Sequence, residues 1–316
     1  MEGAFGLRPA AHVMMAALRT ALRDSTVLLL TVMFLAMVLI AAYLGWAASN
    51  TVEQVYAAAV TSMKAHGQKP VDNPLHEMSA LALLRNMSIY VALLGALAAI
   101  VFGHLVFATD RKSGVLPLVA SRPLARTDLA LGKLGAVAAA ILFLTLFAAA
   151  VNVITLLILP NLLMTPALWA RLAGFYAASA LYMMAFGFLG LACAVYFRSE
   201  SLALLVPVTL WLTLTFMMPQ ITANISPMAA LNPLSATAAV PGGPFFAVTS
   251  TLLGPLSLAE AYRAVSSALL QLAPDNQPHQ SFLGALAILI AAAMLTAAAS
   301  IRAITRFDAS RSDYRD

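Results

Sequence analysis

The sequence predicts an all-α, polytopic membrane protein with six transmembrane helices. The first observation is composition: 62% of the 316 residues are hydrophobic and only 10% are charged, whereas an ordinary soluble domain has about a quarter charged residues. The second is placement, because six stretches longer than 20 residues contain no Asp, Glu, Lys or Arg and together cover 200 residues. These observations exclude a soluble globular protein.

Each charge-free stretch contains an apolar run about long enough to cross a bilayer. About 20 helical residues cover roughly 30 Å of hydrocarbon, since each rises about 1.5 Å. The fifth run is the shortest and contains Pro207, and prolines after Met218 leave no room for a further span there. The predicted spans are 27–48, 87–107, 134–159, 172–197, 202–218 and 282–301.

Lys and Arg are unequally divided between the two sides of this predicted topology. Thirteen lie on the side that holds both termini and five on the other side. Positive residues stay in the cytosol, so both termini are predicted to be cytosolic. The net charge of +5 then lies on the cytosolic face, which removes the need for a nucleic-acid partner. Alanine-rich spans and short loops favour a bacterial inner membrane.

The segments that flank the predicted six-span domain, 27–304, are a lead, 1–26, and a cytosolic tail, 305–316. Within the lead, 9–24 form an expected amphipathic helix in the cytosolic headgroup layer. A plain cytosolic lead is the alternative. Three apolar side chains recur at i, i+4 and i+8, with three polar ones opposite: Met14, Leu18 and Leu22 against His12, Arg19 and Arg23.

Two long segments are predicted on the outer side. Segment 49–85 is predicted to be a solvated loop with one or two short helices. Its His and Met residues are candidate ligands for a soft metal ion, but their spacing fits no known ligand pattern. Segment 219–280 is apolar and rich in proline, and Ser257 with Glu260 forms a capping box before a helix of about four turns closed by Pro274. One apolar stripe runs along this predicted helix: Leu258, Tyr262, Val265, Leu269 and Leu272. We expect it to form a structured cap over the spans.

The loop between spans two and three, 108–133, is the most informative stretch. It has a turn at Ser113-Gly114, a short apolar run, a break at Arg122-Pro123 and a restart capped by Thr127 or Asp128. This pattern predicts a short helix that lies flat against the membrane. Such a helix is suited to couple to a cytosolic partner.

Several kinds of chemistry are missing from the sequence. There is no G-x-x-x-x-G-K-[ST] motif for nucleotide, and no H-E-x-x-H or G-x-S-x-G motif for hydrolysis. The predicted spans avoid charge, and only His104 titrates within them, although ion-driven pumps usually need an ionisable group there. We therefore predict no catalytic residues, no metal site and no enzyme activity in this chain.

The motif Asp110-Arg-Lys-Ser-Gly114, followed by Ser121-Arg-Pro123, Arg126 and Gly132-Lys133, resembles the permease subunits of ABC-2 type transporters. The similarity extends to the entry helix, the six spans and the outer segment between spans five and six. Within that family, the chain is similar to the permease of the nitrous-oxide-reductase maturation system. That narrower resemblance rests on three short stretches: Gly45–Ser49, Arg198–Ser201 and Leu231–Pro233.

The resemblance implies a half-transporter in which two copies of the chain each dock a separate cytosolic ABC ATPase. ATP and Mg would bind in that partner, and this chain would hold no cofactor. Gly114–Pro123 would be the coupling helix, and spans without charge suit an apolar or amphipathic cargo, or transmission of motion to a periplasmic partner. The residues implied in ATPase coupling are Asp110, Arg111, Lys112, Ser113, Gly114, Arg122, Pro123 and Arg126.

Two other classes of function stay open at this point. A secondary carrier or channel would need an ion site, for which the predicted spans offer only His104 and Asn152. A membrane enzyme would need a polar cluster at one face of the membrane, and the sequence does not reveal one.

Overall fold

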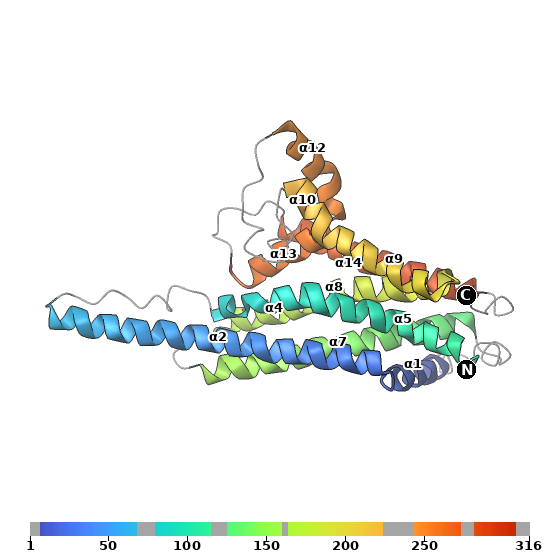
Figure 1. Ribbon diagram of the computed structural model, residues 1–316, viewed down its shortest axis with the longest axis horizontal. Coiled ribbons are helices and arrows are strands. Elements are labelled where there is room, and N and C mark those ends of the chain that lie inside the picture. Colours follow the sequence, from blue (N-terminus) through green and yellow to red (C-terminus); the bar gives the residue numbers. More distant parts are fainter. Residues whose placement is uncertain are drawn as a thin grey trace.

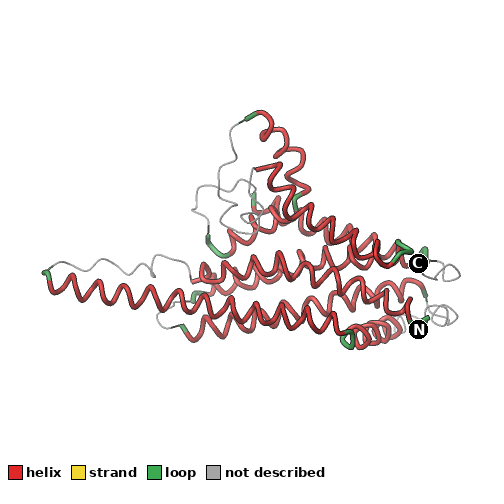
Figure 2. The backbone as a smooth tube through the Cα atoms, viewed as in Figure 1, coloured by secondary structure: helices red, strands yellow, loops and turns green. Residues whose placement is uncertain are grey.

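The computed structural model describes residues 7–67, 80–114, 125–159, 164–223, 243–272 and 281–307. All regular elements in these ranges are helices, as Figure 2 shows, and they contain no strand. Most helices run lengthwise in a bundle, whereas the first, α1 (Leu7–Ala21), is seen obliquely, with its turns foreshortened, in Figure 1. The predicted all-α class is confirmed.

Within the described ranges, six helices are long and apolar enough to cross a membrane. The predicted number of spans is therefore confirmed. We call the end of the bundle with α1 and the last residues of α14 the termini end, and the other the distal end (Figure 1). The six are α2 (Ser25–Ala65), the composite helix Ala80–Lys112, α7 (Arg126–Ile158), α8 (Pro166–Tyr196), the composite helix Glu200–Thr222 and α14 (Phe282–Thr305).

Spans two and five each contain a π-helical segment. Span two consists of η1 (Ala80–Leu84), α4 (Arg85–Tyr90), the π segment η2 (Val91–Gly95) and α5 (Ala96–Lys112). Span five consists of α9 (Glu200–Leu212), the π segment η3 (Thr213–Met217) and α10 (Met218–Ala223).

The π segment η2 helps to join spans two, four and five. A π turn departs from the regular i→i−4 pattern of backbone hydrogen bonds. In η2 the carbonyl of Ala92 accepts hydrogen bonds from Trp211 Nε1 at 3.3 Å and from the Tyr182 hydroxyl at 3.4 Å. Side chains of α8 and α9 are thereby fixed to the backbone of span two.

The first span is much longer than predicted. We expected it to end near Ala48 and a solvated loop to follow, but α2 continues unbroken to Ala65. The stretch from Ala47 to Ala65 contains neither Gly nor Pro and is rich in Ala, so nothing in it ends a helix. At about 1.5 Å per residue, α2 is about 60 Å long, and Figure 1 shows it projecting past the other helices at the distal end.

Helix α8 is the centre of the bundle and packs against α5, α7, α9, α13 (Leu258–Leu269) and α14. Its contact with α5 depends on glycine. A Cβ atom added to Gly103 would lie 1.9 Å from the carbonyl oxygen of Gly187, and one added to Gly190 would lie 2.3 Å from that of Ile100. Small residues allow the backbones of membrane helices to approach closely. Here they do so within one chain.

The amphipathic helix expected over 9–24 is α1, and it packs against α7. Val13 and Met14 contact the surface left open by Gly132 and Gly135. The expected apolar face is correct for Met14 and Leu18 but wrong for Leu22, which is 57% exposed because the helix ends one residue earlier. The placement of α1 in a headgroup layer stays a prediction.

The described part of the segment between spans five and six is helical; the helix after Ser257 was predicted, whereas α12 (Pro244–Leu253) was not. This part comprises the end of α10, α12, η5 (Gly254–Leu256) and α13. Ser257 caps α13, because its hydroxyl accepts a hydrogen bond from the backbone N–H of Glu260 at 3.3 Å. The helix has three turns rather than four, since Gln271 takes a left-handed conformation (φ 54°) just after it.

The expected cap over the spans is wrong for α13, which inserts between α8, α14 and η3. Its Tyr262 hydroxyl lies 2.8 Å from Ser179 Oγ of α8. Ser179 is about 20 Å along α8 from Pro166, close to the middle of that span. The apolar stripe of α13 is therefore buried inside the bundle and not on top of it.

We expect Gly103→Ala to lower the free energy of unfolding by about 1–3 kcal/mol, because the added methyl group meets rigid backbone of α8. Gly135→Ala is the matched control, since its methyl group would meet only the flexible end of Met14, 3.0 Å away. Unfolding by SDS titration in mixed micelles measures both variants. Equal stabilities would contradict the proposed close packing of α5 and α8.

Candidate functional site

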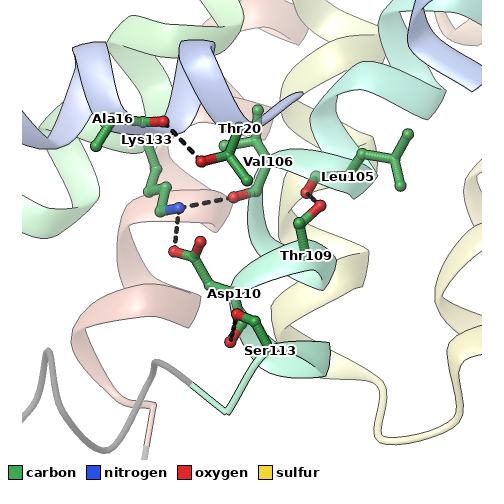
Figure 3. Close-up of polar contacts among 8 residues, drawn as sticks. All are labelled: Ala16, Thr20, Leu105, Val106, Thr109, Asp110, Ser113 and Lys133. Atoms are coloured by element: carbon green, nitrogen blue, oxygen red, sulfur yellow. Dashed lines mark hydrogen bonds and ion pairs between the residues drawn. The ribbon is translucent and has the colours of Figure 1, made fainter. Parts of the chain in front are cut away.

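The cluster at the termini end begins with a buried ion pair between spans two and three. Lys133 of α7 is 2% exposed, and its Nζ donates to Asp110 Oδ2 at 2.5 Å and to the Val106 carbonyl at 2.7 Å (Figure 3). Both partners lie in the last two turns of α5. A buried ammonium group needs such partners, because its desolvation is otherwise too costly.

This pair corrects the expectation that the spans avoid charge. Lys133 was expected in the loop before span three, but α7 already begins at Arg126, seven residues earlier. The N-cap is Ala125, whose side chain makes no capping hydrogen bond, and not Thr127 or Asp128 as predicted. Lys133 therefore lies about two turns inside the helix.

Arg111 is the second buried cation of the cluster and is 9% exposed. Its guanidinium donates to the carbonyl of Phe197 at 2.8 Å and to that of Val195 at 3.2 Å. It also lies over the rings of Phe107 and Phe307, at 5.3 and 5.4 Å from their centroids. The last carbonyls of a helix have no partner within it, so Arg111 of α5 supplies donors to the end of α8.

Lys112 and the residues after it lie nearer to solvent. Lys112 Nζ is 2.5 Å from Glu200 Oε1 of α9, and both side chains are about half exposed. The Ser113 hydroxyl donates to the Asp110 carbonyl at 3.2 Å, and Gly114 has a φ of +66°, which glycine adopts without strain. The predicted turn at Ser113-Gly114 is confirmed.

Arg126, in the first turn of α7, joins this cluster to the last span. Its Nη1 donates to the carbonyls of Thr305 and Phe307 at 3.0 and 3.1 Å, at the end of α14. The structure thus brings Asp110 to Gly114 and Arg126 to one end of the bundle. Arg122, Pro123 and the rest of the predicted coupling helix lie outside the described residues.

Two members of the cluster were not among the predicted site residues: Lys133 and Glu200. In the sequence, each of them is a charge beside an apolar run. The end of span two carries a charge of the other sign for each, Asp110 for Lys133 and Lys112 for Glu200. Opposite charges at the ends of neighbouring spans were a usable signal for such pairs.

A second polar cluster lies in the distal half of the bundle around α13. Thr222 Oγ1 donates to Glu260 Oε1 at 2.5 Å, and Arg263, one turn further along α13, is 3% exposed. The ring of Tyr262 stacks on that of Tyr182 at 4.6 Å. Charged groups at this depth are unexpected from the sequence, since 219–280 was predicted to lie outside the spans.

The two residues that an ion carrier would need do not form one site. His104 is buried in α5, nearly two turns before Asp110 of the Asp110–Lys133 pair. Asn152 donates instead to Tyr176 and to the Ala148 carbonyl, far along α7. The separation of Lys133 and Asn152 on α7 is about 28 Å. Among the residues that the structure describes, no group of three or more His, Cys, Asp or Glu side chains could hold a metal ion.

Removal of one partner of the Asp110–Lys133 pair should show how much this pair contributes to the free energy of unfolding. Asp110→Asn leaves Lys133 buried without its counter-charge and should lower the free energy of unfolding by about 3–5 kcal/mol. Asp110→Asn combined with Lys133→Met should recover most of that loss. Glu200→Gln, which breaks the exposed pair with Lys112, should cost less than about 1 kcal/mol. SDS titration compares the four proteins, and an Asp110→Asn protein as stable as Glu200→Gln would contradict this role.

The comparisons with known proteins identify the family. The family model of the ABC-2 family transporter proteins matches residues 13–310. A search of curated proteins finds no match. The match covers nearly the whole chain, including all six spans and the cluster at the termini end. It does not support the narrower resemblance to the permease of the nitrous-oxide-reductase maturation system. The chain belongs to the ABC-2 transporter family and is a membrane permease subunit of an ABC transporter.

Proposed function

We propose that this permease receives the motion of a separate ATPase through the cluster at its termini end. The observation that carries the proposal is that this cluster ties the residues beside the loop 115–124 to four spans. Asp110 is bound to α7, Arg111 to the end of α8, Lys112 to α9, and Arg126 to the end of α14. A force applied at this loop is therefore delivered to four spans at once.

The energy source proposed for transport is ATP hydrolysis outside the chain. The sequence has no P-loop, so nucleotide would bind in a cytosolic ABC ATPase. We further propose two permeases and two ATPases per transporter, as the family resemblance implies. An apolar or amphipathic cargo, or motion passed to a periplasmic partner, is the hypothesis for what is moved.

One observation in the structure supports the alternative function, a secondary carrier. Glu260 and Arg263 of α13 are ionisable and lie within the bundle, where a carrier could use them. Transport by the isolated chain without any ATPase, lost in Glu260→Gln, would favour that alternative. Transport that requires the ATPase subunit would favour the ATP-driven permease.

Docking of the ATPase is tested by Arg126→Glu with Arg171→Glu as control. Both arginines are exposed and donate to the carbonyls at the end of a neighbouring helix, Arg126 at the termini end and Arg171 to Ala268 at the distal end. We expect only Arg126→Glu to abolish copurification of an ATPase subunit from native membranes. Equal effects of the two changes, or no ATPase in any preparation, would contradict the proposal.

The proposed orientation, with both termini in the cytosol of a bacterial cell, can be tested by cysteine labelling. The native Cys193 is buried, so new cysteines at the exposed Ser62 and Ser113 report on the two ends of the bundle. A membrane-impermeant maleimide should label Ser62→Cys in intact spheroplasts, and Ser113→Cys only after the membrane is opened. The reverse pattern would overturn the orientation.

A further inference from the structure

A groove at the termini end is lined by four arginines from three elements. Its volume is about 460 Å³, within the range of about 300–1,000 Å³ that is usual for small-molecule sites. It lies between the end of α5, the link from α8 to α9, and the last turns of α14. The four arginines are Arg111, Arg198, Arg302 and Arg306.

Three of the four arginines in this groove have no carboxylate partner among the described residues. Arg198, Arg302 and Arg306 are exposed, and in the described part of the chain no carboxylate lies within 4.0 Å of their guanidinium nitrogens. Two carboxylates that flank the groove in sequence are already engaged, Asp110 by Lys133 and Glu200 by Lys112. A third, Asp308, lies outside the described residues. Converging positive charges in a concave site attract an anion.

The other walls of the groove are apolar. Tyr196, Phe307, Val195 and two alanines of α14 complete its lining. An anion with an attached hydrocarbon part fits this combination better than a small, fully hydrated anion. The position fits as well, because Arg111 and Arg302 stand in the last turns of two spans, the level at which lipid headgroups meet a transmembrane helix.

We propose that this groove binds the phosphate group of an anionic phospholipid from the leaflet at the termini end. Arginine forks donate two parallel hydrogen bonds to a phosphate, and basic pockets between transmembrane helices suit such headgroups. Arginines that served only to orient the chain would need no common cavity. Arg198, Arg302 and Arg306 are not among the residues assigned to ATPase coupling, whereas Arg111, the fourth arginine of the groove, is.

The test compares the full chain with two double variants in nanodiscs. Arg302→Gln/Arg306→Gln removes two groove arginines, and Arg19→Gln/Arg23→Gln removes two exposed arginines, also four positions apart, near the end of α1. Native mass spectrometry measures binding of phosphatidylglycerol, with phosphatidylcholine of the same acyl chains as the neutral probe. We expect affinity for phosphatidylglycerol to fall roughly 30-fold in the groove variant and less than about threefold in the control.

Three outcomes would overturn the proposal. Equal losses in the two double variants would mean that only the general charge of this end matters. Displacement of phosphatidylglycerol by an equal concentration of inorganic phosphate would assign the groove to the free ion. Unchanged lipid binding together with loss of ATPase copurification in Arg302→Gln/Arg306→Gln would make the groove part of the docking surface for a protein.

Discussion

An ammonium group enclosed by protein must find its hydrogen-bond acceptors inside the fold, and Lys133 finds two of them on span two. Its contacts with Asp110 and Val106 fix the start of α7 against the end of α5. Two further attachments depend on that alignment: α1 rests on α7 directly beside Lys133, and Arg111 reaches from α5 to the end of α8. The structure of the termini end thus follows from one desolvated charge and its partners.

The six spans could be predicted because hydrophobic length is a strong local signal. Their limits could not, because we used charge to mark the end of a span. Glu53 lies well inside α2, since a stretch rich in alanine and without Gly or Pro continues the helix past a charge. Lys133 lies inside α7, since a charge is tolerated in an apolar region when a carboxylate from another helix meets it.

The motif pointed to residues that the structure gathers at the termini end, but not to the contacts that they make. Nothing local shows that Arg111 binds carbonyls more than eighty positions later, or that Arg126 closes the end of α14. These contacts join residues far apart in the sequence, so they depend on the packing of whole spans. The depth of α13 was missed for the same reason, although its cap at Ser257 and its apolar stripe were read correctly.

The length of α2 has a mechanical consequence. A helix that continues without a break beyond the packed spans is a stiff rod whose base lies among those spans. Because α2 is about 60 Å long, a tilt of about 10° at Ser25 would sweep Ala65 through about 11 Å. Small rotations of the first span would therefore be magnified at the distal end, where α2 projects past the other helices.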